Sequence, residues 1–173
     1  GPAPAWVKVR AMPAIPKAEG EGASRSLLLD VQSYYGPDGD ELYYDTARQV
    51  LNSQGLEDVG MVTENWDPLI ESLTINRLEI IRDGKVIDVL NEGDPFVALR
   101  QERNLSRAML DGRLTATKQI EGLLVGDIVR LATTIKGRDP VLAGHSEFWF
   151  TLWADETMGK LYQRHVWPKG REM

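Results

Sequence analysis

Turn-forming residues recur along this chain about every ten positions, with short β-branched and aromatic runs between them. The clearest case is Asp83-Gly84, which separates the apolar residues 73–81 from the apolar residues 86–90. A type I′ hairpin turn needs positive φ at both central positions, and an Asp-Gly pair adopts it readily. A second turn signal lies at residues 36–39, and Gly126-Asp127 precedes another β-type run. The pattern predicts short strands joined by tight turns.

The fold class follows from what separates these strands. A parallel α/β fold would require amphipathic helices between them, and the sequence lacks these. We therefore predict an all-β or mainly β chain folded as an antiparallel β-sandwich. Residues 95–110 fit two descriptions. Asp94-Pro95 could cap one short helix, whereas the charged centre of the segment equally suits an edge strand or connection.

The 173 residues suffice for a single domain. Residues 1–2 (Gly-Pro) are typical of the remnant left when a protease removes an expression tag. We expect an N-terminal strand at residues 6–9 and a flexible connection within residues 3–25, then one sandwich over residues 26–167. Residues 168–173 are interpreted as the start of a linker to a downstream domain. Further strands are predicted at residues 26–34, 42–51, 59–66, 114–120, 128–135, 148–153 and 161–167.

Composition excludes several classes of site and partner. The chain has no cysteine, so disulfides and thiolate catalysis are ruled out. A net charge of −6 disfavours nucleic acid. No apolar stretch is long enough to insert into a membrane. No cofactor or metal motif is present, so we predict neither group, and sequence leaves the oligomeric state open.

Candidate catalytic groups are few. The histidines His145 and His165 lie outside any nucleophile motif, so structural roles are favoured for both. The acidic turn contributes Asp38, Asp40 and Glu41, which fail the spacing of a calcium loop. A solvated hairpin tip is the expectation for them. A cation site, or a hydrolase in which one of these acids works with a histidine, is the alternative.

Aromatic residues give the one hint of a binding surface. In residues 148–153 the period of two places Trp149 and Trp153 on one face and two phenylalanines on the other. Both faces are apolar, so something must cover the second face: a segment of this chain, a neighbouring domain or a ligand. Together with His165 and Trp167, the two tryptophans form the candidate interaction surface. Tyrosines on either side of the acidic turn suit cross-strand pairing, with sugar stacking as an alternative.

Several ordered segments carry a family resemblance. Individually they are short, but they occur in one order over nearly the whole chain. These segments are residues 4–7 (PAWV), 27–32 (LLLDVQ), 66–68 (WDP), 81–88 (IRDGKVID), 108–115 (AMLDGRLT) and 122–129 (GLLVGDIV). Together they resemble the domain of unknown function that precedes transglutaminase-like domains in bacterial proteins.

The resemblance implies a β-sandwich, an exported (periplasmic) bacterial parent protein and a papain-like Cys-His-Asp domain downstream. It supplies no catalytic residues for the preceding domain, so none are assigned here. We expect a non-catalytic module that serves interdomain packing or positions a polypeptide substrate. Its expected partners are the downstream domain and a polypeptide or glycan. A carbohydrate-binding module that uses exposed aromatics is the alternative.

Overall fold

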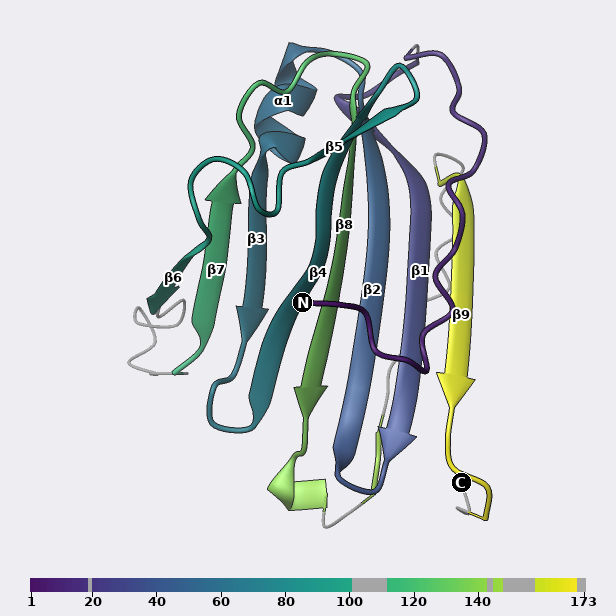
Figure 1. Ribbon diagram of the computed structural model, residues 1–173, viewed down its shortest axis with the longest axis vertical. Helices are drawn as coiled ribbons and strands as arrows, with labels where there is room; N and C mark the ends of the chain where they lie inside the picture. Colours follow the sequence, from purple (N-terminus) through teal and green to yellow (C-terminus); the bar gives the residue numbers. More distant parts are fainter. Residues whose placement is uncertain (19, 101–111, 143–144, 148–157, 171–173) are drawn as a thin grey trace.

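The computed structural model describes residues 1–18, 20–100, 112–142, 145–147 and 158–170. Strands dominate the described residues, with one short α-helix and one 3-10 turn (Figure 1). The elements are β1 (Ser24–Gly36), β2 (Gly39–Val50), α1 (Ser53–Gly60), β3 (Met61–Trp66), β4 (Glu71–Arg82), β5 (Lys85–Asp88), β6 (Val97–Arg100), β7 (Leu114–Gln119), β8 (Ile128–Gly137), η2 (Pro140–Leu142) and β9 (Lys160–Val166). The predicted mainly β fold is confirmed.

The larger sheet has six strands in the order β5-β4-β8-β2-β1-β9. Its neighbours are antiparallel except at one edge, where β9 runs parallel to β1 with Leu28 opposite Lys160. The sheet is therefore mixed, which differs from the fully antiparallel arrangement that we predicted. A parallel neighbour needs a long connection, and residues 138–159 between β8 and β9 provide one.

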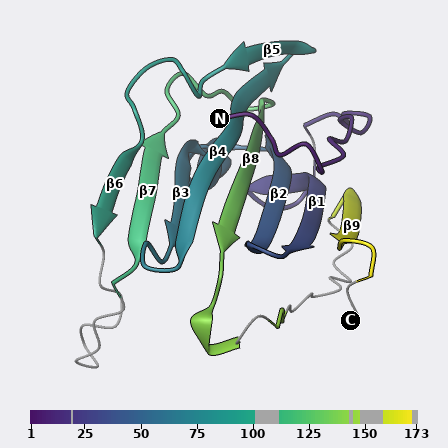
Figure 2. The ribbon, with the colours of Figure 1, turned by 60° about the horizontal axis from the view of Figure 1, so that its bottom comes forward.

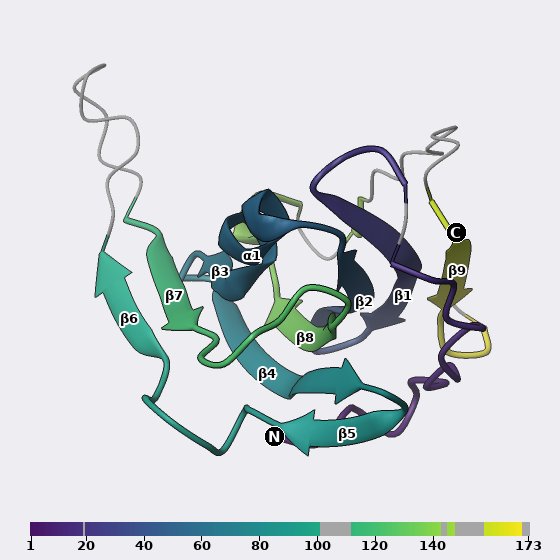
Figure 3. The same ribbon diagram turned by 90° about the horizontal axis from the view of Figure 1, so that it is seen from above.

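The smaller sheet has three antiparallel strands in the order β3-β7-β6 and lies beside β4 (Figure 2). Viewed from above, the larger sheet curves around α1, while β3 and β7 lie on the same inner side (Figure 3). Buried apolar side chains from both sheets and from α1 meet there. This core contains Val50, Val59, Val62, Leu78, Ile80, Ile120 and Val129.

Two predicted turns have the expected geometry. Asp83 (φ 50°) and Gly84 (φ 75°) both have positive φ and join β4 to β5. Residues 37–38 join β1 to β2, with Gly36 opposite Gly39. Residue type explains the turn at Asp83 and Gly84, because few residues tolerate the left-handed conformation. In the turn between β1 and β2 it is the following Gly39 that has positive φ (128°).

The structure corrects three local predictions. Residues 59–60 belong to α1 and not to a strand, because Asn52 caps this helix by accepting a hydrogen bond from the Gly55 amide. Residues 97–100 form strand β6, which replaces the optional helix there, and residues 101–111 lie outside the described residues. The predicted strand at residues 6–9 is absent, since these residues cross the face of the larger sheet and join no ladder.

We call residues 3–18 the N-terminal strap. It lies on the outer face of the larger sheet, opposite α1 (Figure 3). Near it, the Gly1 amine donates to the Ile75 carbonyl, and the Asn76 amide donates to the carbonyls of residues 1 and 2. Met12 packs on a second apolar cluster of the sheet, which contains Leu27, Leu28, Ala47, Ile81 and Ile128. The strap thus covers what would otherwise be a solvent-exposed face.

Candidate functional site

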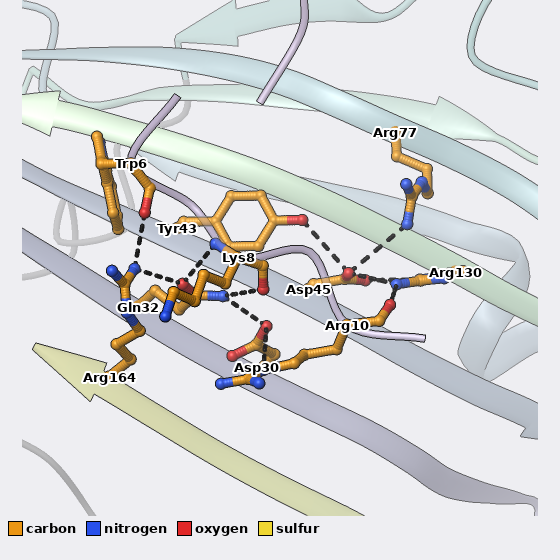
Figure 4. Close-up of polar contacts among 10 residues, drawn as sticks. All are labelled: Trp6, Lys8, Arg10, Asp30, Gln32, Tyr43, Asp45, Arg77, Arg130 and Arg164. Atoms are coloured by element: carbon orange, nitrogen blue, oxygen red, sulfur yellow. Dashed lines mark hydrogen bonds and ion pairs between the residues drawn. The ribbon is translucent and has the colours of Figure 1, made fainter. Parts of the chain in front are cut away.

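The face beneath the strap carries a layer of buried polar side chains. Alternation along β1 places Asp30 and Gln32 on this face, and alternation along β2 places Tyr43 and Asp45 there. The strand register sets Asp30 opposite Asp45 and Gln32 opposite Tyr43. All four residues are at most 1% exposed. We call this group, together with Arg77 of β4 and Arg130 of β8, the polar layer (Figure 4).

Asp45 is the centre of the polar layer. Arg130 donates two hydrogen bonds to its carboxylate, from Nε at 2.9 Å and from Nη2 at 2.7 Å. Arg77 Nη1 lies 3.6 Å from the same carboxylate, and the Tyr43 hydroxyl donates to it at 3.3 Å. Burial lowers the pKa of Arg130, but the hydrogen bonds and charge of Asp45 outweigh this and raise it overall. Arg130 is therefore held in its charged form beside Asp45.

Gln32 connects the polar layer to the strap. Its side-chain oxygen accepts from the Lys8 amide at 3.0 Å, and its side-chain nitrogen donates to the Lys8 carbonyl at 2.9 Å. The same nitrogen donates to Asp30 Oδ2 at 2.7 Å. Arg164 of β9 donates to Gln32 Oε1 at 3.1 Å and to the Trp6 carbonyl at 2.7 Å. The strap is thus bound through its backbone by side chains of the sheet.

Asp30 is the least well compensated member of the layer. It is fully buried, and its Oδ1 has no hydrogen-bond partner within the described part of the chain. Arg10 of the strap approaches the other carboxylate oxygen only to 3.9 Å. Burial raises the pKa of Asp30 above its ordinary value, although the Gln32 hydrogen bond and the Arg10 charge act in the opposite direction.

The predicted interaction surface is described only in part. Trp149 and Trp153 lie outside the described residues. His165 stands on β9, where its Nδ1 lies 3.0 Å from the Tyr35 hydroxyl and its ring stacks on the Tyr35 ring. Trp167 follows the strand and is 45% exposed. The structure therefore places His165 in contact with β1 and Trp167 at the surface beyond β9.

The three predicted acidic residues have separate environments. Asp40 accepts a hydrogen bond from the Ser146 hydroxyl at 2.8 Å. Glu41 accepts from the Trp6 indole and pairs with Lys136 at 3.3 Å. Asp38 lies in the turn between β1 and β2. Among the described residues no three acidic or histidine side chains converge to form a metal site.

A cavity of about 420 Å³ lies at this end of the larger sheet, near the turn between β1 and β2. Asp40, His145 and Ser146 line it, together with Arg138 and Lys169. Ser146 bonds directly to Asp40, so no imidazole stands between the acid and the hydroxyl as it does in a Ser-His-Asp arrangement. The hydrogen bond from the Ser146 hydroxyl ties residue 146 to Asp40 of β2.

A family model described as a domain of unknown function with a solved structure, DUF3857, matches residues 38–173. The chain belongs to the DUF3857 family. Among solved structures the DUF3857 domain is similar to a protein from Parabacteroides distasonis titled a "putative protease". The TM-score is 0.58 at 13% identity, and the match covers 67% of this chain and 23% of that one. The DUF3857 domain thus spans about a quarter of the length of that protein, and the likeness is one of fold. No curated protein matches.

Within the described residues of the DUF3857 domain, no helix is both long and apolar enough to cross a membrane.

The polar layer of the DUF3857 domain was not predicted from the sequence. A signal exists in hindsight: Asp30 with Gln32, and Asp45 with Tyr43, interrupt apolar strands at a spacing of two. On an isolated strand that spacing is typical of a solvent-facing side. Only the strap, which returns across the sheet, turns this side into an interior.

The raised pKa of Asp30 predicts how stability depends on pH. In the unfolded chain the Asp30 carboxyl has a pKa near 3.8, and in the folded protein its pKa is higher. The ionised carboxyl is therefore less favourable in the folded state, so the free energy of unfolding falls as the pH rises above about 3.8. The substitution Asp30→Asn keeps the shape of the side chain and removes its ability to ionise. We expect the stability of this variant relative to wild type to increase between about pH 4 and about pH 7 in urea unfolding.

Asp88→Asn is the matched control for this experiment. Hydrogen bonds from Asn91 and Leu90 lower the pKa of Asp88, so its ionised form favours the folded state. The control variant should therefore lose stability relative to wild type as the pH rises toward about 3.8, and the difference should change little between about pH 4 and about pH 7. A pH-independent difference for Asp30→Asn would contradict the environment assigned to Asp30.

Proposed function

We propose that this domain is a non-catalytic module of a larger, exported bacterial protein. In this proposal it precedes a transglutaminase-like domain with papain-like Cys-His-Asp chemistry, packs against it and helps to position its polypeptide substrate. One observation carries the proposal: three of the five candidate side chains are engaged in contacts that hold the fold. Asp40 accepts a hydrogen bond from the Ser146 hydroxyl, and Glu41 accepts one from the Trp6 indole. His165 is hydrogen-bonded to the Tyr35 hydroxyl.

The similarity to a longer protein supports the modular part of the proposal. In the Parabacteroides protein this fold accounts for 23% of the chain, so the same architecture occurs there as one part of a larger molecule. A domain used in this way commonly contacts its neighbour through an exposed surface near the connection. The end of β9 and the exposed Trp167 are such a surface in this chain.

The packing role is tested by amide hydrogen exchange on the parent protein. Exchange over residues 160–167 is measured in the 173-residue chain and in a version extended through the next domain. We expect slower exchange at β9 and Trp167 in the extended version, because docking removes these amides from water. The β4–β5 hairpin is the internal control, since no contact is proposed there.

Unchanged exchange over residues 160–167 would contradict docking at this surface. The coding sequence beyond residue 173 provides an independent check. A downstream segment that contains a Cys, His and Asp set supports the transglutaminase-like assignment, and a segment without these residues contradicts it. Titration with polysaccharides, monitored by tryptophan fluorescence, tests the carbohydrate-binding alternative.

A further inference from the structure

We propose that the outer face of the larger sheet is a binding groove for an extended polypeptide segment, which the N-terminal strap occupies as an exchangeable internal ligand. This proposal rests on the proposed role in substrate positioning and deepens it, because it names the groove and the class of ligand. The groove is the surface from β9 to β4, with the polar layer as its floor (Figure 4).

The groove binds the backbone of the strap at every second residue. Arg164 donates to the Trp6 carbonyl, Gln32 donates to the Lys8 carbonyl, and Gln32 also accepts from the Lys8 amide. Trp6 lies in a turn that the Val7 amide closes by donating to the Pro4 carbonyl. Residues 8–10 follow without a turn and present alternate carbonyls to the sheet, so this part of the strap is extended. The side-chain amide of Gln32 here takes the place of a peptide group on a neighbouring strand, with one donor and one acceptor.

A third contact continues this spacing. Arg130 Nη2 donates to the Arg10 carbonyl at 2.7 Å while the other hydrogen bonds of Arg130 go to Asp45. None of these contacts depends on which side chain the bound residue carries. A different extended segment can therefore make the same hydrogen bonds, as peptides do when they bind along a sheet edge.

Side chains at two positions of the strap add selectivity. The Trp6 ring stacks on Tyr34 with centroids 5.7 Å apart. Four residues later, the guanidinium of Arg10 lies 4.7 Å from the centroid of the Tyr162 ring and faces Asp30. Lys8 and Val9, between them, are exposed. The groove thus fits a segment with an aromatic residue and, four positions later, a basic residue.

Two observations indicate that the strap can be replaced. No residue of the strap is itself buried, although Met12 packs on the second apolar cluster and Trp6 stacks on Tyr34. Removal of the strap therefore costs less apolar contact than removal of a core strand would. The floor is also incompletely satisfied, because the fully buried Asp30 Oδ1 has no hydrogen-bond partner among the described residues. A segment that donates a hydrogen bond to this oxygen would bind more tightly than the strap does.

The experiment uses the full chain, folded and then cut. A specific protease site is introduced at the exposed residues 20–22, and the chain is cleaved after folding. A fluorescent peptide with the sequence of residues 3–18 is then added in excess, and its uptake is measured by anisotropy. Hydrogen exchange at β2 and β8 reports on the fold in the same sample. We expect peptide uptake while these strands stay protected.

Two modified peptides test the mode of binding. N-methylation of the Lys8 amide removes the donor to Gln32, and we expect about tenfold weaker binding. The same modification at Val9, whose amide has no hydrogen bond within the described residues, is the control and should change affinity by less than about twofold.

Three results would overturn the proposal. In the first, the amides of β2 and β8 lose their protection from hydrogen exchange whenever the strap is released, which would make the strap a permanent layer of the fold. The cut chain could retain its strap and take up no peptide. The two methylated peptides could bind equally well. Each result is independent of the exchange at residues 160–167, so a failure here is distinguishable from a failure of the docking proposal.

Discussion

Replacing Arg130 by alanine is expected to lower the free energy of unfolding by about 3–5 kcal/mol, the cost of leaving a buried carboxylate without its partner. Asp45 is fully buried and receives two hydrogen bonds from Arg130. In the variant only Arg77, at 3.6 Å, and the Tyr43 hydroxyl remain beside it. The loss also removes the hydrogen bond to the Arg10 carbonyl and so loosens the strap.

Urea unfolding measures this change, and Arg48→Ala is the matched control. Arg48 lies on β2, is exposed, and donates to the Ser24 hydroxyl. Its removal should cost less than about 1 kcal/mol, as is usual for a surface contact. If both variants cost the same, Arg130 and Asp45 do not form a buried pair. The double variant Asp45→Ala with Arg130→Ala should cost less than the two single changes added together, because neither charge is then left unpaired.

Leu78→Ala is expected to lower the free energy of unfolding by roughly 3 kcal/mol, within the usual range for a truncated buried leucine. Leu78 stands on β4, is 1% exposed and belongs to the core between the two sheets and α1. The cavity would open beside Val59 of the helix and Val62 of β3. The variant therefore tests whether the smaller sheet and α1 are held by this core.

Leu124→Ala is the control for the core variant, because Leu124 is 53% exposed and lies outside the strands. Its truncation should change stability by less than about 0.5 kcal/mol. Thermal unfolding compares the two variants directly. Equal midpoints would mean that Leu78 is not at the centre of the core and would contradict the packing of the two sheets described above.

The polar layer also has a consequence for register. The side chains of a strand alternate between faces, so a slip of β2 by one residue would move Asp45 from the strap side to the apolar core. The same slip would carry Val50 out of that core. A buried ion pair contributes little net stability, but a misplaced one is costly. We interpret the Asp45–Arg130 pair as a device that fixes the pairing of β2 with β8.

Local residue chemistry explains which parts of the fold were predictable. Asp83 and Gly84 form the predicted turn because the conformation depends on these residues and on little else. The helix α1 was missed, although Asn52 followed by Leu56 and Val59 is a usable signal of a capped amphipathic helix. A helix this short gains most of its stability from packing, so the periodicity around it was too weak to identify it.

The candidate site was predictable to a smaller degree. The acidic residues Asp38, Asp40 and Glu41 were identified as a group, but the structure gives Asp40 and Glu41 different partners. Those partners, Ser146 and Trp6, are distant in sequence. His165 was correctly placed on the last described strand, and its contact with Tyr35 depends on the parallel pairing of β9 with β1. No local pattern encodes such a pairing.

The sequence by itself determined the β class of this protein, its tight turns, and the absence of cysteine chemistry. These properties depend on the residue types and on backbone preferences over a few positions, which act before any long-range contact forms. The tertiary structure alone decided that residues 3–18 return across the larger sheet and that Asp30, Gln32 and Asp45 face an interior. Burial depends on what the rest of the chain places over a side chain. Here the strap that covers these residues is distant in sequence from the strands that carry them.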